Sequence, residues 1–212
     1  MCADDPGGER MRCLMCGRKY RSDGSLAEIL LREDPLCEKC RGQWQRNHSI
    51  RRLDGIRVDS TWIYNDAYAE ALLQFKELGD EALQDIFLYP VVKQLKRRYA
   101  GWTLVLMPSS AHKESVRGFS HLKEMFSCLG LPMIRPFIKL ADTDQKKMNA
   151  VSRQEMEHLI VLKDNAVLPR KIVLADDVIT TGSTLRGALH CLDRKKHRIR
   201  IYACASVPRP LP

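Results

Sequence analysis

The chain has no long hydrophobic run, and this absence excludes a class of protein. None of its apolar stretches approaches the roughly 18 residues that a membrane-spanning helix requires. Hydrophobic residues make up 44% of the 212 positions and charged residues 29%, which is ordinary for a soluble globular protein. We therefore expect no membrane insertion, and one full domain with a hydrophobic core plus a small appended module.

The N-terminus also lacks the basic and then apolar pattern of a secretory signal. It reads "MCADDPGGER", which is acidic and rich in glycine. We therefore expect a cytoplasmic protein, in which thiols stay reduced. The eight cysteines of the chain then need an explanation other than disulfide bonds.

Four of these cysteines form two C-x2-C pairs separated by 20 residues: Cys13, Cys16, Cys37 and Cys40. A thiolate pair from each of two knuckles closes a tetrahedron around Zn²⁺, and four thiolates leave no open position for substrate. The spacing predicts a structural zinc, without which a module of about 40 residues hardly folds. Two coincidental pairs, or a redox dithiol, are the less favoured alternatives.

A net charge of +9 suggests an anionic partner such as nucleic acid or a polyphosphorylated metabolite, although a basic surface also aids solubility. The stretch 41–60 is polar and basic, which indicates a domain boundary near it. We predict a zinc-finger module with a basic linker over 1–55 and a main domain over 56–212. This stretch favours a solvated linker. The alternative is contact with a phosphate backbone and a stacked base through Trp44, His48 and five arginines, Arg41, Arg46, Arg51, Arg52 and Arg57.

Beyond this boundary, predicted strands and helices alternate. We expect strands over 62–64, 103–107, 171–176 and 198–207, and helices over 67–75, 80–99, 121–130 and 184–196, with Pro90 bending or splitting the second helix. Such alternation predicts an α/β fold with a mainly parallel sheet that helices cover on both faces. Ligands of such sheets bind beyond the carboxyl ends of the strands.

The segment "IVLADDVITTGST", residues 172–184, lies at one of these strand ends. The helix that follows offers unpaired N–H groups and a partial positive charge at its N-terminus. Gly182 allows a phosphate to approach the backbone closely. Four hydroxyl groups add hydrogen-bond donors: Thr180, Thr181, Ser183 and Thr184. The loop is therefore a predicted phosphate cradle. It is not a Walker A loop, because Ala188 and Leu189 stand where lysine and serine or threonine are required.

Two adjacent carboxylates, Asp176 and Asp177, precede this loop. Carboxylates only accept hydrogen bonds at neutral pH, so at the rim of a phosphate site they suit the hydroxyls of a ribose or a Mg²⁺ that accompanies pyrophosphate. A ligand with a 5-phosphate, vicinal hydroxyls and a diphosphate would engage both halves of the segment.

This segment resembles the phosphoribosyl pyrophosphate (PRPP) motif of type I phosphoribosyltransferases. Other segments resemble ComF-type proteins, a bacterial group associated with natural competence for DNA uptake: "QFKELGD" at 74–80, "VRGFSHL" at 116–122, Gln145 followed by Arg153, and the cysteine pairs. The resemblance runs from Cys13 to about Val207. It implies a type I phosphoribosyltransferase-like, mainly parallel sheet flanked by helices, with a small N-terminal zinc-ribbon-like module.

The resemblance also implies roles for single residues. Asp176 and Asp177 match the acidic pair for ribose hydroxyls or Mg²⁺, and Thr180, Thr181, Gly182, Ser183 and Thr184 match the 5-phosphate loop. Lys76 matches a lysine on the pyrophosphate side, and Arg117 an arginine of a mobile loop over the diphosphate; a surface lysine and a surface arginine are the alternatives. The chain departs from the family at Ser120, commonly asparagine, and in "PSSAHKES" at 108–115. His112 and His121 flank this loop, and we interpret them as surface or packing histidines.

Two functions follow from these observations. The first is support of single-stranded DNA uptake or handling during transformation, with a PRPP-type pocket and, on the resemblance alone, a helicase-like ATPase of the competence machinery as partner. The alternative is an active phosphoribosyltransferase that displaces pyrophosphate from PRPP with the help of Mg²⁺ and of Asp176, Asp177, Lys76 and Arg117, on an acceptor that the sequence does not identify. Whether catalysis occurs is left open. The basic segments at 93–99 and 194–200 suit phosphates, and equally suit helix C-termini.

Overall fold

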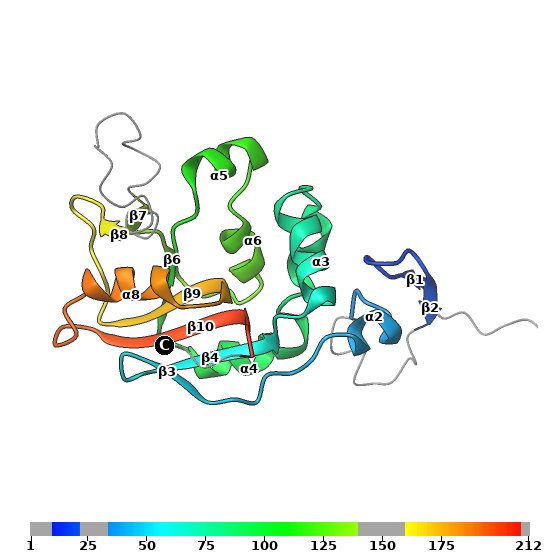
Figure 1. The fold of residues 1–212 in the computed structure, drawn as a ribbon, viewed down its shortest axis with the longest axis horizontal. Helices are drawn as coiled ribbons and strands as arrows, with labels where there is room; N and C mark the ends of the chain where they lie inside the picture. Colours follow the sequence, from blue (N-terminus) through cyan, green and yellow to red (C-terminus); the bar gives the residue numbers. More distant parts are fainter. Residues whose placement is uncertain (1–9, 22–33, 140–159, 209–212) are drawn as a thin grey trace, which may run out of the picture.

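The centre of the protein is a six-stranded, mainly parallel sheet. The computed structural model describes residues 10–21, 34–139 and 160–208 (Figure 1). The strand order is β3 (Arg51–Leu53), β4 (Ile56–Ile63), β10 (Arg198–Ser206), β9 (Lys171–Ile179), β5 (Thr103–Leu106) and β6 (Met133–Ile134). Only the β3–β4 pair in this sheet is antiparallel. The predicted α/β class with a mainly parallel sheet is confirmed.

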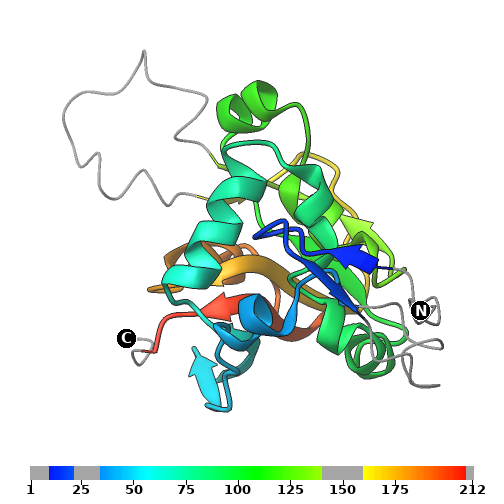
Figure 2. The ribbon, with the colours of Figure 1, turned by 90° about the vertical axis from the view of Figure 1, so that its right-hand side faces the viewer.

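Helices follow the strands in the predicted alternation. They are α3 (Asp66–Lys76), α4 (Val92–Arg98), α5 (Ala111–Arg117), α6 (His121–Ser127) and α8 (Ser183–His190), with 3-10 turns η1 (Glu81–Asp85) and η2 (Tyr89–Val91). The predicted helix over 80–99 is split as expected, because Pro90 has no N–H to donate within a helix. The rings of Tyr99 and Phe126 both contact Tyr202, which places α4 and α6 on the same face of the sheet (Figure 2).

Strand β9 is longer than the sequence pattern predicts. We expected it to end at Asp176, but it continues to Ile179, because β10 offers a parallel partner as far as the pair Ser206 and Ile179. The expected strand over 62–64 likewise begins at Ile56 and ends at Ile63. Both aspartates therefore lie inside a strand, where successive side chains point to opposite faces.

Part of the predicted linker 41–60 belongs to the fold, namely Trp44 and strands β3 and β4, whereas most residues of 45–50 are exposed. Trp44 is 6% exposed and its ring lies 5.2 Å from that of Trp62 and 4.8 Å from that of Tyr68. Packed in this way, Trp44 has no free face on which a base could stack, so that part of the alternative is wrong too. Burial of the Trp44 indole against these rings is favourable because it removes a large apolar area from water.

The N-terminal module is a hairpin of β1 (Arg10–Arg12) and β2 (Lys19–Arg21), followed after a gap in the description by α2 (Glu38–Gly42). It lies beyond α3 at one end of the sheet (Figure 1). A separate pair, β7 (Phe137–Lys139) and β8 (Ile160–Leu162), flanks the other side. Gln145 and Arg153 fall outside the described residues. The predicted division at residue 55 stays a prediction.

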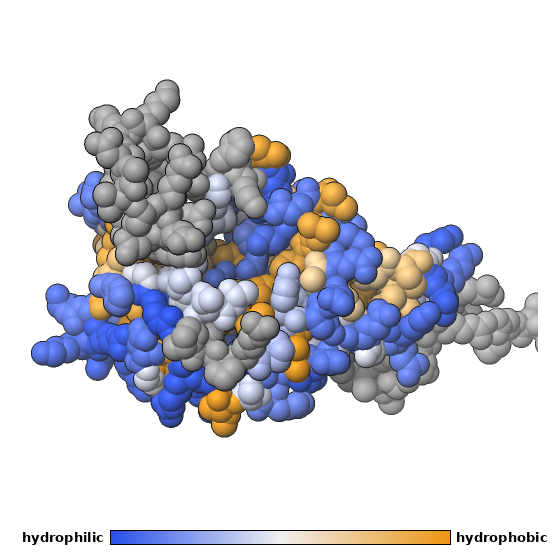
Figure 3. Space-filling view, viewed as in Figure 1, coloured by the Kyte–Doolittle hydropathy of each residue, from blue (hydrophilic) through white to orange (hydrophobic). Residues whose placement is uncertain are grey.

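Much of the surface is polar. On the face drawn in Figure 3, hydrophobic residues are scattered among hydrophilic ones. Within the described ranges, no helix combines the length and the apolar character needed to cross a bilayer.

Candidate functional site

The junction between β9 and α8 forms the predicted cradle. Gly182 has φ +77°, in the left-handed region that glycine adopts readily, and this turns the chain into α8 at Ser183. A small hollow of about 30 Å³ is lined by Asp176, Thr180, Gly182, Ser183 and Thr184 together with Val178, Ile179 and Leu185. Ligand pockets usually measure about 300 Å³ or more. Only a small group of a ligand enters the loop in this conformation.

The two aspartates face different surroundings. Asp176 lines the hollow with the hydroxyl loop. Asp177 is the next residue of the same strand, so its side chain points to the opposite face, where it is 7% exposed. This arrangement explains how adjacent carboxylates are tolerated. The two residues are neighbours along β9, but only the side chain of Asp176 lines the hollow with the hydroxyl loop.

Asp177 is held by side chains from two helices. Its Oδ2 lies 2.5 Å from Nζ of Lys76, at the end of α3, and 3.1 Å from Nε2 of His121, at the start of α6. Arg117, at the end of α5, lies with Nη1 3.0 Å from Nδ1 of His121, and its Nε donates to the carbonyl oxygen of Lys76. The structure therefore places three of the predicted residues, Lys76, Arg117 and Asp177, in one connected cluster.

The hydrogen bonds assign the proton of His121. Arginine only donates, so Nδ1 accepts from Arg117, and the ring proton lies on Nε2 and is donated to Asp177. Burial lowers the pKa of His121, outweighing the attraction of Asp177, which favours this neutral form. Both ring nitrogens are thus engaged.

Opposite electrostatic effects act on the two carboxyls. Burial raises the pKa of Asp177, but the Lys76 cation and the His121 hydrogen bond outweigh burial and hold it well below its usual range. Burial and the neighbouring charge of Asp177 raise the pKa of Asp176 well above its usual range. The pair therefore divides into one firmly ionised carboxylate, fixed by cations, and one carboxyl that resists ionisation.

His121 is the site residue that the sequence interpretation missed. We expected a surface or packing histidine, and it is 4% exposed, but it bridges Arg117 and Asp177. Its position four residues after Arg117 was the only local sign. Asp177 lies 56 residues further along the chain, and no periodic pattern reports a contact over that separation. The side chain of His112 lies outside the description.

The four predicted metal ligands converge. Within the described chain, the sulfur atoms of Cys13, Cys16, Cys37 and Cys40 all lie within 4.8 Å of one another. The Cys16 and Cys37 sulfurs are 3.8 Å apart, and a tetrahedron with Zn–S bonds of 2.3 Å has edges of about 3.8 Å. Burial raises the pKa of Cys13, but backbone hydrogen bonds at Cys37, Cys16 and Met15 lower it to about 7, whereas burial and the neighbouring thiols raise the pKa of Cys40 well above its usual range. The donor set fits a structural zinc.

Comparison with known proteins identifies relatives along most of the chain. It is 27% identical over 225 residues to the competence protein ComFC of Bacillus subtilis (strain 168), covering 91% of this chain and 94% of that protein. It is 25% identical over 207 residues to the competence protein ComFC of Streptococcus pneumoniae (strain ATCC BAA-255 / R6), covering 86% and 94%. No family model matches.

Among solved structures, a hypoxanthine phosphoribosyltransferase from Staphylococcus aureus is similar over 66% of this chain and 74% of its own. The sequence identity is 14% and the TM-score is 0.34.

Proposed function

We propose that this chain, which is similar over most of its length to two competence proteins, handles single-stranded DNA during uptake and binds a phosphoribosyl ligand where β9 meets α8. The competence role is supported by two relatives named as competence proteins, whose similarity covers most of the chain. We further propose that residues 1–55 form the zinc-finger module with its linker, and that 56–212 form the ligand-binding domain.

The connected cluster of Lys76, Arg117, His121 and Asp177 carries the ligand proposal. The cluster brings the cationic side chains of Lys76 and Arg117 next to strand β9. Asp176, the residue before Asp177 in this strand, lines the hollow with the hydroxyl loop. In this proposal the loop takes the 5-phosphate and Asp176 accepts from ribose hydroxyls, and the diphosphate extends past the strand end to Lys76 and Arg117 on the other face.

Mg²⁺ fits the donor chemistry of the site, because carboxylate oxygens are among its preferred ligands. Asp176 and Asp177 are the residues that would hold it, and the ion would neutralise charge on the diphosphate. Asp177 already receives Lys76 and His121 on one oxygen and the backbone N–H of Val178 on the other, at 2.6 Å. Lys76 therefore competes with a cation for this carboxylate.

The observations favour ligand binding over transfer to an acceptor. Transfer from PRPP needs cations that stabilise the leaving pyrophosphate, and Lys76 and Arg117 meet this need. It also benefits from a base that takes a proton from the acceptor. His121 belongs to the cluster, but both of its ring nitrogens are engaged in hydrogen bonds. An active phosphoribosyltransferase remains the second function to test.

A calorimetric titration of the zinc-loaded protein with PRPP and Mg²⁺ tests the pocket. We expect Asp176→Asn and Lys76→Gln each to weaken binding about tenfold or more, which is about 1.4 kcal/mol. The matched control is Lys93→Gln, which removes the same charge from an exposed position on α4, and we expect a change of less than about twofold because its charge acts only at long range. Equal affinity in all four proteins would exclude the pocket.

The same titration with a labelled single-stranded oligonucleotide already bound tests whether the two ligands are linked. A changed PRPP affinity would show coupling between the sites. Release of pyrophosphate in the presence of candidate acceptors would establish the second function.

A further inference from the structure

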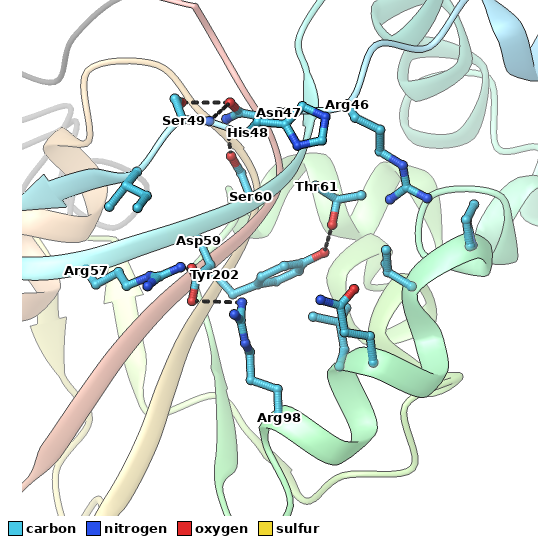
Figure 4. A pocket seen from close by; sticks show the side chains of 15 residues that line it. Arg46, Asn47, His48, Ser49, Arg57, Asp59, Ser60, Thr61, Arg98 and Tyr202 are labelled. Atoms are coloured by element: carbon cyan, nitrogen blue, oxygen red, sulfur yellow. Dashed lines mark hydrogen bonds and ion pairs between the residues drawn. The ribbon is translucent and has the colours of Figure 1, made fainter.

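A larger cavity lies away from the β9–α8 junction. It has a volume of about 360 Å³ and lies between the segment 46–50, strands β4 and β10, and helix α4 (Figure 4). None of its lining residues lines the hollow beside Asp176. Its volume lies within the range of about 300–1,000 Å³ that is usual for small-molecule sites.

The floor and one wall of this cavity are well ordered by packing. Thr61 and Tyr202 form the floor, are 7% and 2% exposed, and share a hydrogen bond of 2.7 Å between their hydroxyls. Pro90, Val91 and Leu95 form an apolar wall along η2 and α4. An apolar wall opposite polar groups is the usual composition of a pocket for a ring with charged substituents.

Positive charge exceeds negative charge around this floor. Arg57 places Nε 2.8 Å from Oδ1 of Asp59, and Arg98 places Nη1 3.3 Å from Oδ2 of the same residue. The carboxylate of Asp59 therefore pairs with two guanidinium groups, each of which has five N–H donors. Among the described residues, neither guanidinium has a second carboxylate partner.

Arg46 adds a third cation, from the segment that precedes β3. Its guanidinium carbon lies 4.3 Å from the centre of the Trp62 ring, and no carboxylate pairs with it in the parts of the chain that the structure describes. Burial lowers its pKa, and so does the nearby charge of Arg41. An anion close to Arg46 would relieve both effects. Figure 4 shows Arg57 and Arg98 beside Asp59, and Arg46 apart from them, toward the hydroxyl end of Tyr202.

We propose that this cavity, the Arg46–Arg98 pocket, binds a phosphate-bearing nucleotide unit, with the phosphate at the arginines and the ring against Pro90, Val91 and Leu95. Arginine is the side chain that best matches phosphate, because its planar fork donates two parallel hydrogen bonds. Gln94 and His48 add polar groups at the edge of the pocket. The unit is supplied either by a free nucleotide or by one residue of a single strand.

The Arg46–Arg98 pocket and the proposed PRPP site share no lining residue, so each can be tested separately. The probes are thymidine 5′-monophosphate and a 12-residue oligothymidylate without a terminal phosphate, each titrated into the full zinc-loaded chain at one fixed salt concentration. The variants are Arg46→Gln and Arg98→Gln. The matched control is Arg97→Gln, which removes the same charge from the adjacent position of α4, outside the pocket.

We expect Arg46→Gln and Arg98→Gln to weaken at least one probe about tenfold, and Arg97→Gln to change it less than about twofold, since a general electrostatic effect would act on all three alike. Tighter binding of the monophosphate identifies a free nucleotide as the source, and tighter binding of the oligonucleotide identifies a strand. Titration of the unchanged protein with each probe and, separately, with PRPP separates failure here from failure of the PRPP proposal, because the two hollows share no lining residue.

Two results would overturn the inference. One is the absence of binding of either probe to the unchanged protein. The other is an equal loss with Arg97→Gln, which would show a diffuse basic surface without a pocket. Thermal unfolding of each variant checks the fold, and Arg98→Lys should lose most of the binding too if the planar guanidinium, and not only its charge, is recognised.

Discussion

At the residue scale, the neighbours Asp176 and Asp177 have the same chemistry and opposite energetics. Asp177 is surrounded by donors, from Lys76, His121 and the backbone of Val178. Asp176 has no cation at hydrogen-bonding distance among the described residues, although its Oδ1 accepts from the backbone N–H of Asp177 at 3.0 Å. Their contributions to stability should therefore have opposite signs.

We predict that Asp177→Asn lowers the free energy of unfolding at pH 7 by about 2–4 kcal/mol, because it leaves a largely buried cation without its partner. Asp176→Asn should raise it by about 1 kcal/mol, because an amide can still accept from the backbone and carries no charge to be buried or repelled. Urea denaturation of both variants measures the two differences. A loss of equal size in both would contradict the assignment.

The pH dependence provides a second check. The folded pKa of Asp177 lies below the unfolded value of about 3.9, so its stabilisation is complete above that value and is lost as the pH falls below it. The difference between the unchanged protein and Asp177→Asn should therefore shrink as the pH falls below about 4. A difference that stays constant down to pH 3 would show that Asp177 is not preferentially ionised in the fold.

At the scale of a single element, the turn from β9 into α8 depends on Gly182. Its φ of +77° is one that side chains with a Cβ adopt only at a cost. Gly55, between β3 and β4, has a similar φ of +80° and open space where a Cβ would lie. A residue with a Cβ would therefore be strained to a similar degree at either position, although the two positions lie in different turns.

We predict that Gly182→Ala and Gly55→Ala each destabilise the protein by about 1–2 kcal/mol. Only Gly182→Ala should weaken PRPP binding, because only this turn presents the backbone N–H groups of α8. Thermal unfolding and calorimetry on both variants separate the two effects. If both variants bind equally well, the loop does not hold the phosphate.

At the scale of the whole molecule, the cysteine cluster and the sheet are joined by Arg41 and Trp44. Arg41 forms two hydrogen bonds of 2.7 Å with Asp34 and one of 3.0 Å with the carbonyl of Ile86. Its guanidinium also lies over the ring of Trp44, which packs on Trp62. Order in the module is therefore connected to packing at the edge of the sheet.

We predict that Cys37→Ser abolishes zinc binding and lowers the thermal midpoint of the main domain, because Trp44 loses its support. Metal analysis and the fluorescence of the Trp44–Trp62 pair follow the two events. The matched control is Cys128→Ser, half-buried and outside the cluster, which should keep one zinc per chain. Full zinc content in Cys37→Ser would refute the site, and an unchanged midpoint would show that the module is energetically separate.

Short-range patterns in the sequence determined much of this protein. The C-x2-C pairs predicted the sulfur cluster because each knuckle is a local turn, and the alternation of apolar strands with helices predicted the parallel sheet because each element buries a face set by its own period. Pro90 predicted the break before α4 for a similarly local reason. The acidic pair and the Thr-rich loop likewise marked the β9–α8 junction.

Contacts between distant segments were decided only by the tertiary structure. The length of β9 depended on β10, the burial of Trp44 on Trp62 and Tyr68, and the role of His121 on an aspartate 56 residues away. The Arg46–Arg98 pocket likewise depends on the packing of the segment 46–50 and helix α4 beside strands β4 and β10. Local sequence records the period of an element, whereas the partner that meets each face is selected by packing of the whole chain.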